Sequence, residues 1–355
     1  MARADTTYRL LVQLLHPHLD RSAVESVLKQ AAINWEHIVV VASKELVLPT
    51  LYCNLHRLDL LDYLPDDLKA YLEDLTTINR NRNQTLLEEV FEIHRILEAQ
   101  TIDHVFLKGA ALLASGFYDD LGVRMVGDID VLVAPKDLEL AQACLIQNGY
   151  QEIPITFGNK YFEHKHLPRL FSDTRLGAVE VHRKLLAKPT LNLLNPKAVL
   201  ASKQVVADLP IPNISHLMTH AVLNFQVNDT GAAFGFLSLR SAYDVLVLDE
   251  RLSQKSFNQL IDSPPIRAYF NKLQVYAAIQ HPYPLSTKDR LLQWGFKVKQ
   301  GHWFALRLWN TSIRFGRFVR VAANRSWLFI SNRNYRKDCY RDRHRVFRKL
   351  LHMKP

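Results

Sequence analysis

The sequence predicts an α+β protein, in which a small core with a mixed sheet is flanked by helical regions on both sides. An apolar run over residues 126–133 has the length of a buried strand, and helical periodicity precedes and follows the segment around it. The predicted parts are an N-terminal helical region, an α/β core, a C-terminal helical domain and a basic aromatic tail, over residues 1–100, 101–190, 191–300 and 301–355.

The N-terminal region is predicted to be helical from the spacing of its apolar residues. Leu86, Val90, Ile93 and Leu97 recur every three or four residues with charged residues between them, as in an amphipathic helix. Pro65, followed by two aspartates, is typical of a helix start. We interpret this region as packing scaffold.

The core is predicted to combine short strands with two helices. One helix begins near Gly109, and another lies between Pro135 and Gln147, because proline favours the first helical turn and Asn148–Gly149 follows as a stop. The predicted strands cover His104–Leu107, 126–133, Tyr150–Ile155, Tyr161–His166 and Ala178–Arg183.

The C-terminal domain is predicted to be helical after a proline-rich linker. Pro196 and Pro210–Pro212 mark the linker, and Ser215 is a candidate cap for a helix that carries His216 and His220. Further helices are expected over Leu237–Leu248, from Pro264 with an apolar stripe of Ile266, Tyr269, Phe270 and Leu273, and from a capping box at Ser286 and Asp289.

Two pairs of polar residues interrupt the predicted strands at a spacing of two. Asp128 and Asp130 leave the same face of one strand, because alternate side chains point to opposite faces. Glu180 and His182 share a face of another strand in the same way. Neighbouring carboxylates repel unless a cation lies between them, and hard divalent ions prefer carboxylate oxygens. Metals on shared carboxylates serve in-line phosphoryl and nucleotidyl displacement.

The composition narrows the class of protein. A hydrophobic content of 48% and a charged content of 23% are ordinary for a globular protein. The three cysteines, Cys53, Cys144 and Cys339, are far apart and lack metal-binding spacing, which predicts a reducing compartment. The first residues lack the apolar core of a signal peptide, and no apolar run reaches the ~20 residues of a membrane span. We therefore expect a cytoplasmic protein.

The net charge of +10 is concentrated near the end of the chain, since Arg314–Lys354 contains 13 Lys and Arg against 2 Asp. Three interpretations remain open. The basic and aromatic residues could bind RNA through phosphates and stacked bases, or lie on an anionic membrane surface as an amphipathic helix. Alternatively, the aromatic residues, among them Trp303, Trp309, Phe315 and Phe318, pack onto the helical domain while the arginines are solvated.

Four segments together resemble the polymerase-beta-like nucleotidyltransferase superfamily. They are Leu107–Ala111 (LKGAA), Arg124, Gly127–Val133 (GDIDVLV) and Val179–His182 (VEVH). More narrowly, the chain is similar to a largely uncharacterised bacterial nucleotidyltransferase family with an LKG, R, DIDLLV and E-x-H pattern. The resemblance implies a Mg²⁺-dependent enzyme, with Mn²⁺ as a substitute. It would move a nucleoside monophosphate from an NTP, such as ATP, to an acceptor hydroxyl and release pyrophosphate.

The resemblance also implies residue roles. The catalytic, metal-binding carboxylates would be Asp128, Asp130 and Glu180, and the nucleotide would be bound by Lys108, Gly109, Arg124 and Gly127. The chain departs from the superfamily at Gly109–Ala110, where Gly-Ser or Gly-Gly commonly contacts the triphosphate. Lys108 and Arg124 are therefore expected to supply the phosphate-binding charge.

Several residues keep more than one interpretation. His182 could orient Glu180, contact the acceptor or simply be packed, and Arg124 could contact phosphate, orient Asp128 or form a structural ion pair. His216, His220 and Asp244 are candidates for lining a cleft, although Arg240 and Asp244 at i, i+4 would by default form a helix-surface ion pair. His164 and His166 are expected to be exposed.

Two alternative functions stay open. One is a non-catalytic nucleotide- or RNA-binding module with a degenerate core. The other is a membrane-surface factor in polysaccharide or lipid-linked metabolism.

Overall fold

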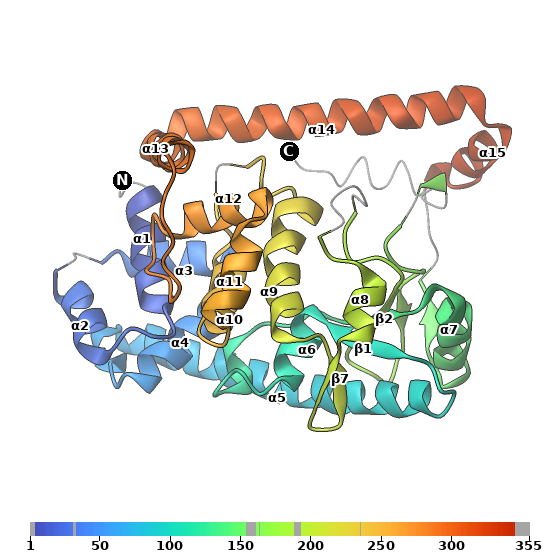
Figure 1. Ribbon diagram of the computed structural model, residues 1–355, viewed down its shortest axis with the longest axis horizontal. Helices are drawn as coiled ribbons and strands as arrows, with labels where there is room; N and C mark the ends of the chain where they lie inside the picture. Colours follow the sequence, from blue (N-terminus) through green and yellow to red (C-terminus); the bar gives the residue numbers. More distant parts are fainter. Residues whose placement is uncertain are drawn as a thin grey trace.

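The computed structural model describes residues 4–30, 33–153, 161–162, 164–187, 193–234 and 236–344. It confirms the α+β class, because a five-stranded mixed sheet lies among helices from both ends of the chain (Figure 1). The N-terminal helices are α1 (Ala4–Leu15), α2 (Arg21–Gln30), α3 (Trp35–Lys44), α4 (Leu48–Arg57) and α5 (Asp66–Glu98), with a short turn η1 (Leu61–Tyr63) before α5.

The core contains the sheet and its covering helices. Its strands are β1 (His104–Leu107), β2 (Asp128–Val133), β3 (Gln151–Glu152), β4 (Leu170–Phe171) and β5 (Ala178–His182). Its helices and helical turns are α6 (Lys108–Ala114), η2 (Leu121–Val123), η3 (Pro135–Asp137) and α7 (Leu138–Gln147). The strand order is β1-β2-β5-β4-β3, with β2 and β5 parallel and the other neighbours antiparallel.

The apolar run forms the buried centre of the sheet, as predicted. Ile129, Val131, Leu132 and Val133 are fully buried, because α6 packs on β1 and β2, α7 packs on β5, and the long helix α5 contacts both helices. A buried strand covered in this way reads as a continuous apolar sequence. The two aspartates of β2 therefore stand out from an otherwise apolar strand.

Helix α5 also fixes the connection that leads into β2. The side-chain amide of Asn79 donates to the backbone carbonyl of Gly122 at 2.7 Å. The side-chain amide of Asn83 donates to the backbone carbonyls of Leu121 and Arg124 at 2.6 and 2.7 Å. Both asparagines are buried. These bonds satisfy backbone carbonyls that the irregular segment leaves unpaired, and they set the position of Arg124 beside the sheet.

Two predicted strands differ from the structure. The strand predicted over Tyr150–Ile155 is limited to β3 among its described residues, and residues 154–155 lie outside them. The strand predicted over Tyr161–His166 is wrong: of its described residues, His166 alone forms a bridge, to His182. Pro168 follows and has no N–H to donate, so the pairing stops there and β4 takes over beside β5.

The predicted linker is also wrong. Pro196 begins helix α8 (Pro196–Ala201), and Pro210 lies in a hairpin of β6 (Gln204–Val206) and β7 (Leu209–Ile211) that packs on β1. The turn residues Ala207 and Asp208 both have positive φ, 45° and 66°. Positive φ at both positions is typical of a tight hairpin turn, which usually contains glycine or asparagine. Neither residue is present here, so the sequence does not indicate the turn.

The C-terminal part is helical, as expected. Its elements are α9 (Ile214–Leu223), a π-helical turn η5 (Asn224–Asn228), α10 (Leu239–Asp249), α11 (Gln254–Ile261), α12 (Pro264–Leu273), α13 (Thr287–Gly301), α14 (Trp303–Ser331) and α15 (Arg333–Arg341). The capping box of Ser286 and Asp289 and the buried stripe of α12 are present. The cap of α9 is Asn213 and not Ser215, because the Asn213 side chain accepts from the amide of His216.

Helix α14 runs along the edge of the molecule opposite α5 (Figure 1). The interpretation that its aromatic residues pack onto the helical domain is wrong for Phe315 and Phe318, each 66% exposed. The side chain of Trp303 and residues 345–355 of the predicted tail lie outside the described residues. No single helix in the described part of the chain is long and apolar enough to cross a membrane, although α3 and α4, bent by 119°, meet the criterion together.

Candidate active site

The parallel pairing of β2 and β5 brings three of the predicted site residues together. In the register of these strands Asp130 lies beside Glu180 and Leu132 lies beside His182. One ligand atom from each of Asp130, Glu180 and His182 lies within 4.8 Å of the others, and we call these residues the acidic cluster. The cluster joins residues 50 positions apart in the sequence and could hold a metal ion.

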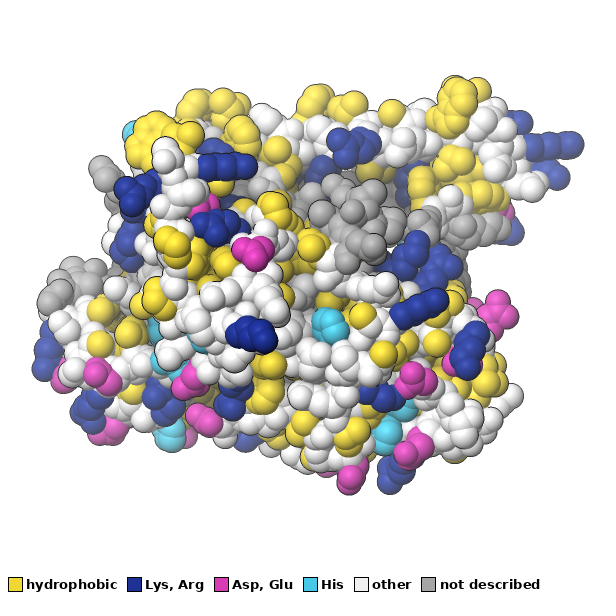
Figure 2. Space-filling view, viewed as in Figure 1, with side chains coloured by type: hydrophobic (Ala, Val, Ile, Leu, Met, Phe, Trp, Pro, Cys, Tyr) yellow, Lys and Arg dark blue, Asp and Glu magenta, His cyan; other side chains and the backbone are white. Residues whose placement is uncertain are grey.

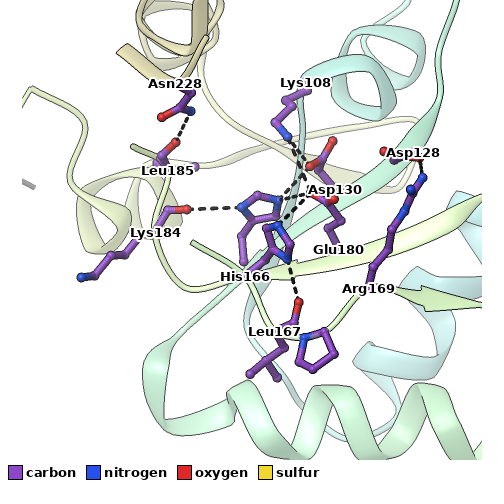
Figure 3. A network of polar contacts seen from close by, with 12 residues as sticks. Lys108, Asp128, Asp130, His166, Leu167, Arg169, Glu180, Lys184, Leu185 and Asn228 are labelled. Atoms are coloured by element: carbon purple, nitrogen blue, oxygen red, sulfur yellow. Dashed lines mark hydrogen bonds and ion pairs between the residues drawn. The ribbon is translucent and has the colours of Figure 1, made fainter. Parts of the chain in front are cut away.

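Lys108 supplies the nearest positive charge to the acidic cluster (Figure 3). Its Nζ donates to Asp130 Oδ1 at 2.5 Å and lies 4.0 Å from Glu180 Oε2. The Nε2 atom of His182 lies 2.8 Å from Asp130 Oδ1 and 3.3 Å from Glu180 Oε2. Asp130 and His182 are both buried, so these contacts are shielded from water.

The protonation of the acidic cluster follows from these contacts. Burial opposes ionisation of Asp130, but Lys108 and His182 outweigh it and hold the pKa of that carboxyl well below its usual range. Burial likewise opposes the charge on Glu180, whose pKa is nevertheless lowered by the hydrogen bond from His182. For His182, burial favours the neutral ring, but the two carboxylates raise its pKa. The cluster therefore keeps two negative charges.

Two histidines point their Nε2 atoms at these carboxylates. The Nδ1 atom of His182 lies 3.3 Å from the carbonyl of Lys184, and that of His166 lies 2.7 Å from the carbonyl of Leu167. A carbonyl only accepts, so each Nδ1 carries its hydrogen and each Nε2 offers a lone pair or a second proton. His166 Nε2 lies 3.6 Å from Glu180 Oε2. A backbone carbonyl that fixes the tautomer in this way is typical of metal-binding histidines.

The expected exposure of His164 and His166 is wrong, because both are half-buried. His166 was not predicted as a site residue, because its place beside Glu180 depends on the bridge between His166 and His182, which is a tertiary contact. No spacing in the chain indicates this contact.

Asp128 lies apart from the acidic cluster and is paired with another residue. Its carboxylate forms an ion pair with Arg169, which directly precedes β4, and its side chain is 33% exposed. The proposed orientation of Asp128 by Arg124 is therefore wrong. Arg169 has no recognisable motif around it, and its role could not be predicted from the sequence.

A cleft of about 270 Å³ opens beside the strands. Most of the predicted residues line it: Lys108, Gly109, Arg124, Gly127, Asp128, Asp130, His220 and Asp244. The opposite wall comes from α9, η5 and α10 and includes Asn224, Asp229, Arg240 and Ser241. The core and the C-terminal helices thus enclose a polar space between them.

The structure gives Arg124 a structural partner in this cleft. Its Nε and Nη2 donate to the two oxygens of Asp244, both at 2.9 Å, and the hydroxyl of Tyr118 donates to Asp244 Oδ1 at 2.6 Å. The expected surface pair of Arg240 and Asp244 is wrong, since Asp244 is buried against Arg124. A Cβ at Gly109 would lie 2.7 Å from Arg124 Nη1, so the small residue makes room for the guanidinium.

His220 lines the cleft with a buried side chain. It is 4% exposed, and its Nε2 has no hydrogen-bond partner among the described residues. Burial lowers the pKa of His220 to about 3, so the ring is neutral. His216, one turn earlier, is absent from the lining of the cleft and contacts Ser202 Oγ at 3.1 Å instead. The two histidines therefore do not form a joint site.

Three further charged residues near the cleft were not predicted as site residues. Asp229 and Arg240 line the cleft, and Lys165 lies near the positive charge of Lys108. No side-chain hydrogen bond or ion pair joins any of the three to another described residue. Burial raises the pKa of Asp229 and lowers those of Lys165 and Arg240. These side chains are available to a bound molecule.

Lys108 adopts a backbone conformation that is unusual for a lysine. Its φ is 50°, in the left-handed region, at the junction of β1 and α6. Such a residue outside glycine stores roughly 1 kcal/mol or more of strain and is frequent at functional sites. The strained junction aims the lysine side chain at Asp130.

A family model described as an uncharacterised nucleotidyltransferase matches residues 31–280. The chain belongs to this nucleotidyltransferase family. The family resemblance seen in the sequence is thereby confirmed, and a comparison with curated proteins gives no match. The matched range contains the whole acidic cluster and both walls of the cleft, and it ends before α13.

Proposed function

We propose that this member of the nucleotidyltransferase family moves a nucleoside monophosphate from an NTP to an acceptor hydroxyl in a divalent-metal-dependent reaction. The observation that supports the proposal best is the convergence of Asp130, Glu180 and His182 beside Lys108, in a chain of a nucleotidyltransferase family. In this reaction a bond forms between the acceptor oxygen and the α-phosphorus, the bond from that phosphorus to the β-phosphate breaks, and pyrophosphate leaves.

The donor atoms of the acidic cluster suit a divalent metal ion. Two carboxylates offer the oxygen ligands that Mg²⁺ prefers, and the imidazole adds a donor that Mn²⁺ also accepts. We assign Asp130 and Glu180 as ligands, with His182 beside them and Asp128 two residues away on the same strand. When bound, the ion supplies charge that polarises phosphoryl oxygens and favours ionisation of the acceptor hydroxyl.

The cationic side chains are assigned to the triphosphate. Lys108 lies at the acidic cluster, and Arg240 is half-buried on the facing wall with no carboxylate partner among the described residues. A desolvated cation without a partner is costly unless a ligand supplies the opposite charge. Together Lys108 and Arg240 would hold the pyrophosphate as it leaves and stabilise the charge that develops on it. Arg124 is assigned a positioning role because Asp244 occupies it.

The remaining polar groups are assigned to the acceptor. Glu180 lies in the acidic cluster and can accept the proton of the acceptor hydroxyl. His220 is neutral, lines the cleft that Asp130 also lines, and has an Nε2 without a partner among the described residues, so it can hydrogen-bond to a hydroxyl. The acceptor itself is defined only as a hydroxyl compound that fits between these groups.

The test is transfer of label from a panel of α-labelled NTPs with Mg²⁺ or Mn²⁺ and cell extract, together with pyrophosphate release. Asp130→Asn and Glu180→Gln should each abolish transfer, because each removes a charge of the acidic cluster. Asp103→Asn is the matched control, since Asp103 is an exposed acid paired with Lys203 outside the cleft. Thermal unfolding of each variant separates loss of activity from loss of fold.

Transfer that survives in both cluster variants would overturn the assignment of the site. Absence of transfer from every NTP, with nucleotide binding equal in wild type and variants, would instead favour a non-catalytic binding module.

A further inference from the structure

Helix α14 carries a long apolar stripe on its exposed side. Leu308, Phe315, Val319 and Ile330 are 59%, 66%, 47% and 73% exposed. At 3.6 residues per turn their positions fall within an arc of about 60°, and the stripe is about 33 Å long. Figure 2 shows hydrophobic side chains along the outer edge of this helix. Singly exposed apolar residues are common, but a row of this length marks an interaction surface.

The charges of α14 are of one sign and lie beside the stripe. The helix contains five arginines, Arg307, Arg314, Arg317, Arg320 and Arg325, and no Asp, Glu or Lys. Each arginine position lies at least about 100° from the centre of the stripe around the helix axis. The cross-section therefore has an apolar sector without charge, bordered by guanidinium groups.

Contacts with the C-terminal domain hold α14 in this orientation. Trp309 Nε1 donates to the carbonyl of Ala233 at 2.9 Å, and Arg317 Nη1 donates to Thr230 Oγ1 at 2.5 Å. Lys299 of α13 lies over the Trp309 ring at 3.9 Å. Around the helix axis Arg317 lies about 170° and Trp309 about 90° from the centre of the stripe. These contacts therefore leave the stripe itself exposed and fix its orientation.

Helix α13 extends the same kind of surface at one end of α14. Leu291, Leu292 and Trp294 are 64%, 48% and 63% exposed, and they lie between Arg290 and Lys297, with Lys288 two residues earlier. Figure 2 shows a hydrophobic cluster over α13 with basic side chains beside it. We call the exposed apolar residues of both helices and their basic neighbours the α13–α14 edge.

We propose that the α13–α14 edge binds the surface of an anionic lipid bilayer. An amphipathic helix lies in the bilayer interface with its apolar sector among the acyl chains and its cationic side chains at the level of the headgroups. Arginines at the border of the sector can reach phosphate while their stems stay on the apolar surface. The absence of acidic residues from α14 matches a negatively charged surface.

Other occupants fit the observations less well. Bases of RNA could stack on exposed rings such as Phe315, but the aliphatic side chains of Leu308, Val319 and Ile330 form most of the stripe and are buried only by an apolar partner. A second copy of the chain would bring two rows of arginines together without acidic partners. The proposal is independent of the proposed transfer reaction, because the edge lies outside the residues that match the family.

The test is flotation of the full-length protein with vesicles of phosphatidylcholine alone or with about 30% phosphatidylglycerol, at low and high salt. Binding to the anionic vesicles is expected, with little binding to neutral ones and a decrease as salt screens the arginines. Leu308→Gln/Phe315→Gln/Val319→Gln should lower the partition coefficient at least about tenfold. Arg314→Gln/Arg320→Gln should reduce the preference for anionic vesicles.

The matched control is Tyr71→Gln/Ile78→Gln/Leu140→Gln, which removes apolar residues 51%, 65% and 46% exposed on α5 and α7. It should bind vesicles like the wild type, and circular dichroism checks that every variant is folded. Equal vesicle binding by the stripe variant and the wild type would overturn the proposal. Binding of RNA by both the wild type and the stripe variant, with no binding of vesicles, would also overturn it. The same holds if the wild type binds no vesicles but forms an oligomer that the stripe variant does not form.

Discussion

Replacing Asp244 by alanine should destabilise the fold by about 3–5 kcal/mol, because Arg124 would become a buried charge without a partner. The side chains of Arg124 and Asp244 are 11% and 7% exposed, and two parallel hydrogen bonds of 2.9 Å join them. The change would also leave the hydroxyl of Tyr118 without its acceptor. Arg240, which lines the same cleft, adds a second positive charge nearby.

A series of variants separates the charge from the packing. Asp244→Asn keeps an acceptor and should cost less, about 1.5–3 kcal/mol, the usual loss for a hydrogen bond to a charged group. Arg124→Met/Asp244→Leu removes both charges and should be more stable than Asp244→Ala, because an apolar pair replaces a buried ion pair with little loss. Asp62→Ala is the control, since Asp62 is 95% exposed and its pair with Lys69 should contribute less than about 1 kcal/mol.

The assay is urea unfolding followed by far-UV circular dichroism at constant pH, with free energies from linear extrapolation. A loss below about 1 kcal/mol for Asp244→Ala would refute the reasoning, because it would mean that water or another group neutralises Arg124. A double variant less stable than Asp244→Ala would refute it as well.

Three further outcomes are expected. Gly109→Ala places a Cβ against the Arg124 guanidinium and should lower stability by about 1–3 kcal/mol in the same urea assay, and an unchanged midpoint would contradict the packing role. His220→Ala should lower kcat/KM for label transfer about a hundredfold with His220→Gln partly rescuing it, whereas equal rates would exclude the contact with the acceptor. Burial lowers the pKa of His104 to about 4, below its unfolded value, so its contribution to stability is present at neutral pH and is lost as the pH falls toward 4. Between about pH 8 and about pH 5, the free energy of unfolding measured in urea should therefore fall by about 2 kcal/mol more for the wild type than for His104→Asn. Parallel pH profiles of the two proteins would contradict this.

The elements that carry the acidic cluster could be predicted because their signals are local. A continuous apolar run gave the strand of Asp130, and alternation gave the strand of Glu180 and His182. The capping box at Ser286 and the proline at the start of α12 are likewise read from neighbouring residues. Patterns of this kind depend on the spacing within one element and need no knowledge of the fold.

The partners of the charged residues could not be predicted, because each pair joins distant parts of the chain. Arg124 and Asp244 are 120 positions apart, and Asp128 and Arg169 are 41 apart. The hairpin after α8 was missed for a different reason, since its positive φ angles fall on alanine and aspartate instead of glycine. Tertiary contacts thus decide the pairs, and turn geometry is hidden when an unfavoured residue adopts it.

The contact between Lys108 and Asp130 links the two things that the site is proposed to bind. In the chain alone the lysine neutralises the aspartate at 2.5 Å, so one ammonium group cannot serve the carboxylate and a phosphate equally at the same time. A cation that takes over the charge of Asp130 would release Lys108 for the triphosphate. Because linkage is reciprocal, nucleotide held by the lysine would in turn raise the affinity of the carboxylates for that cation. Metal and nucleotide should therefore each strengthen the binding of the other, through a single exchange of partners.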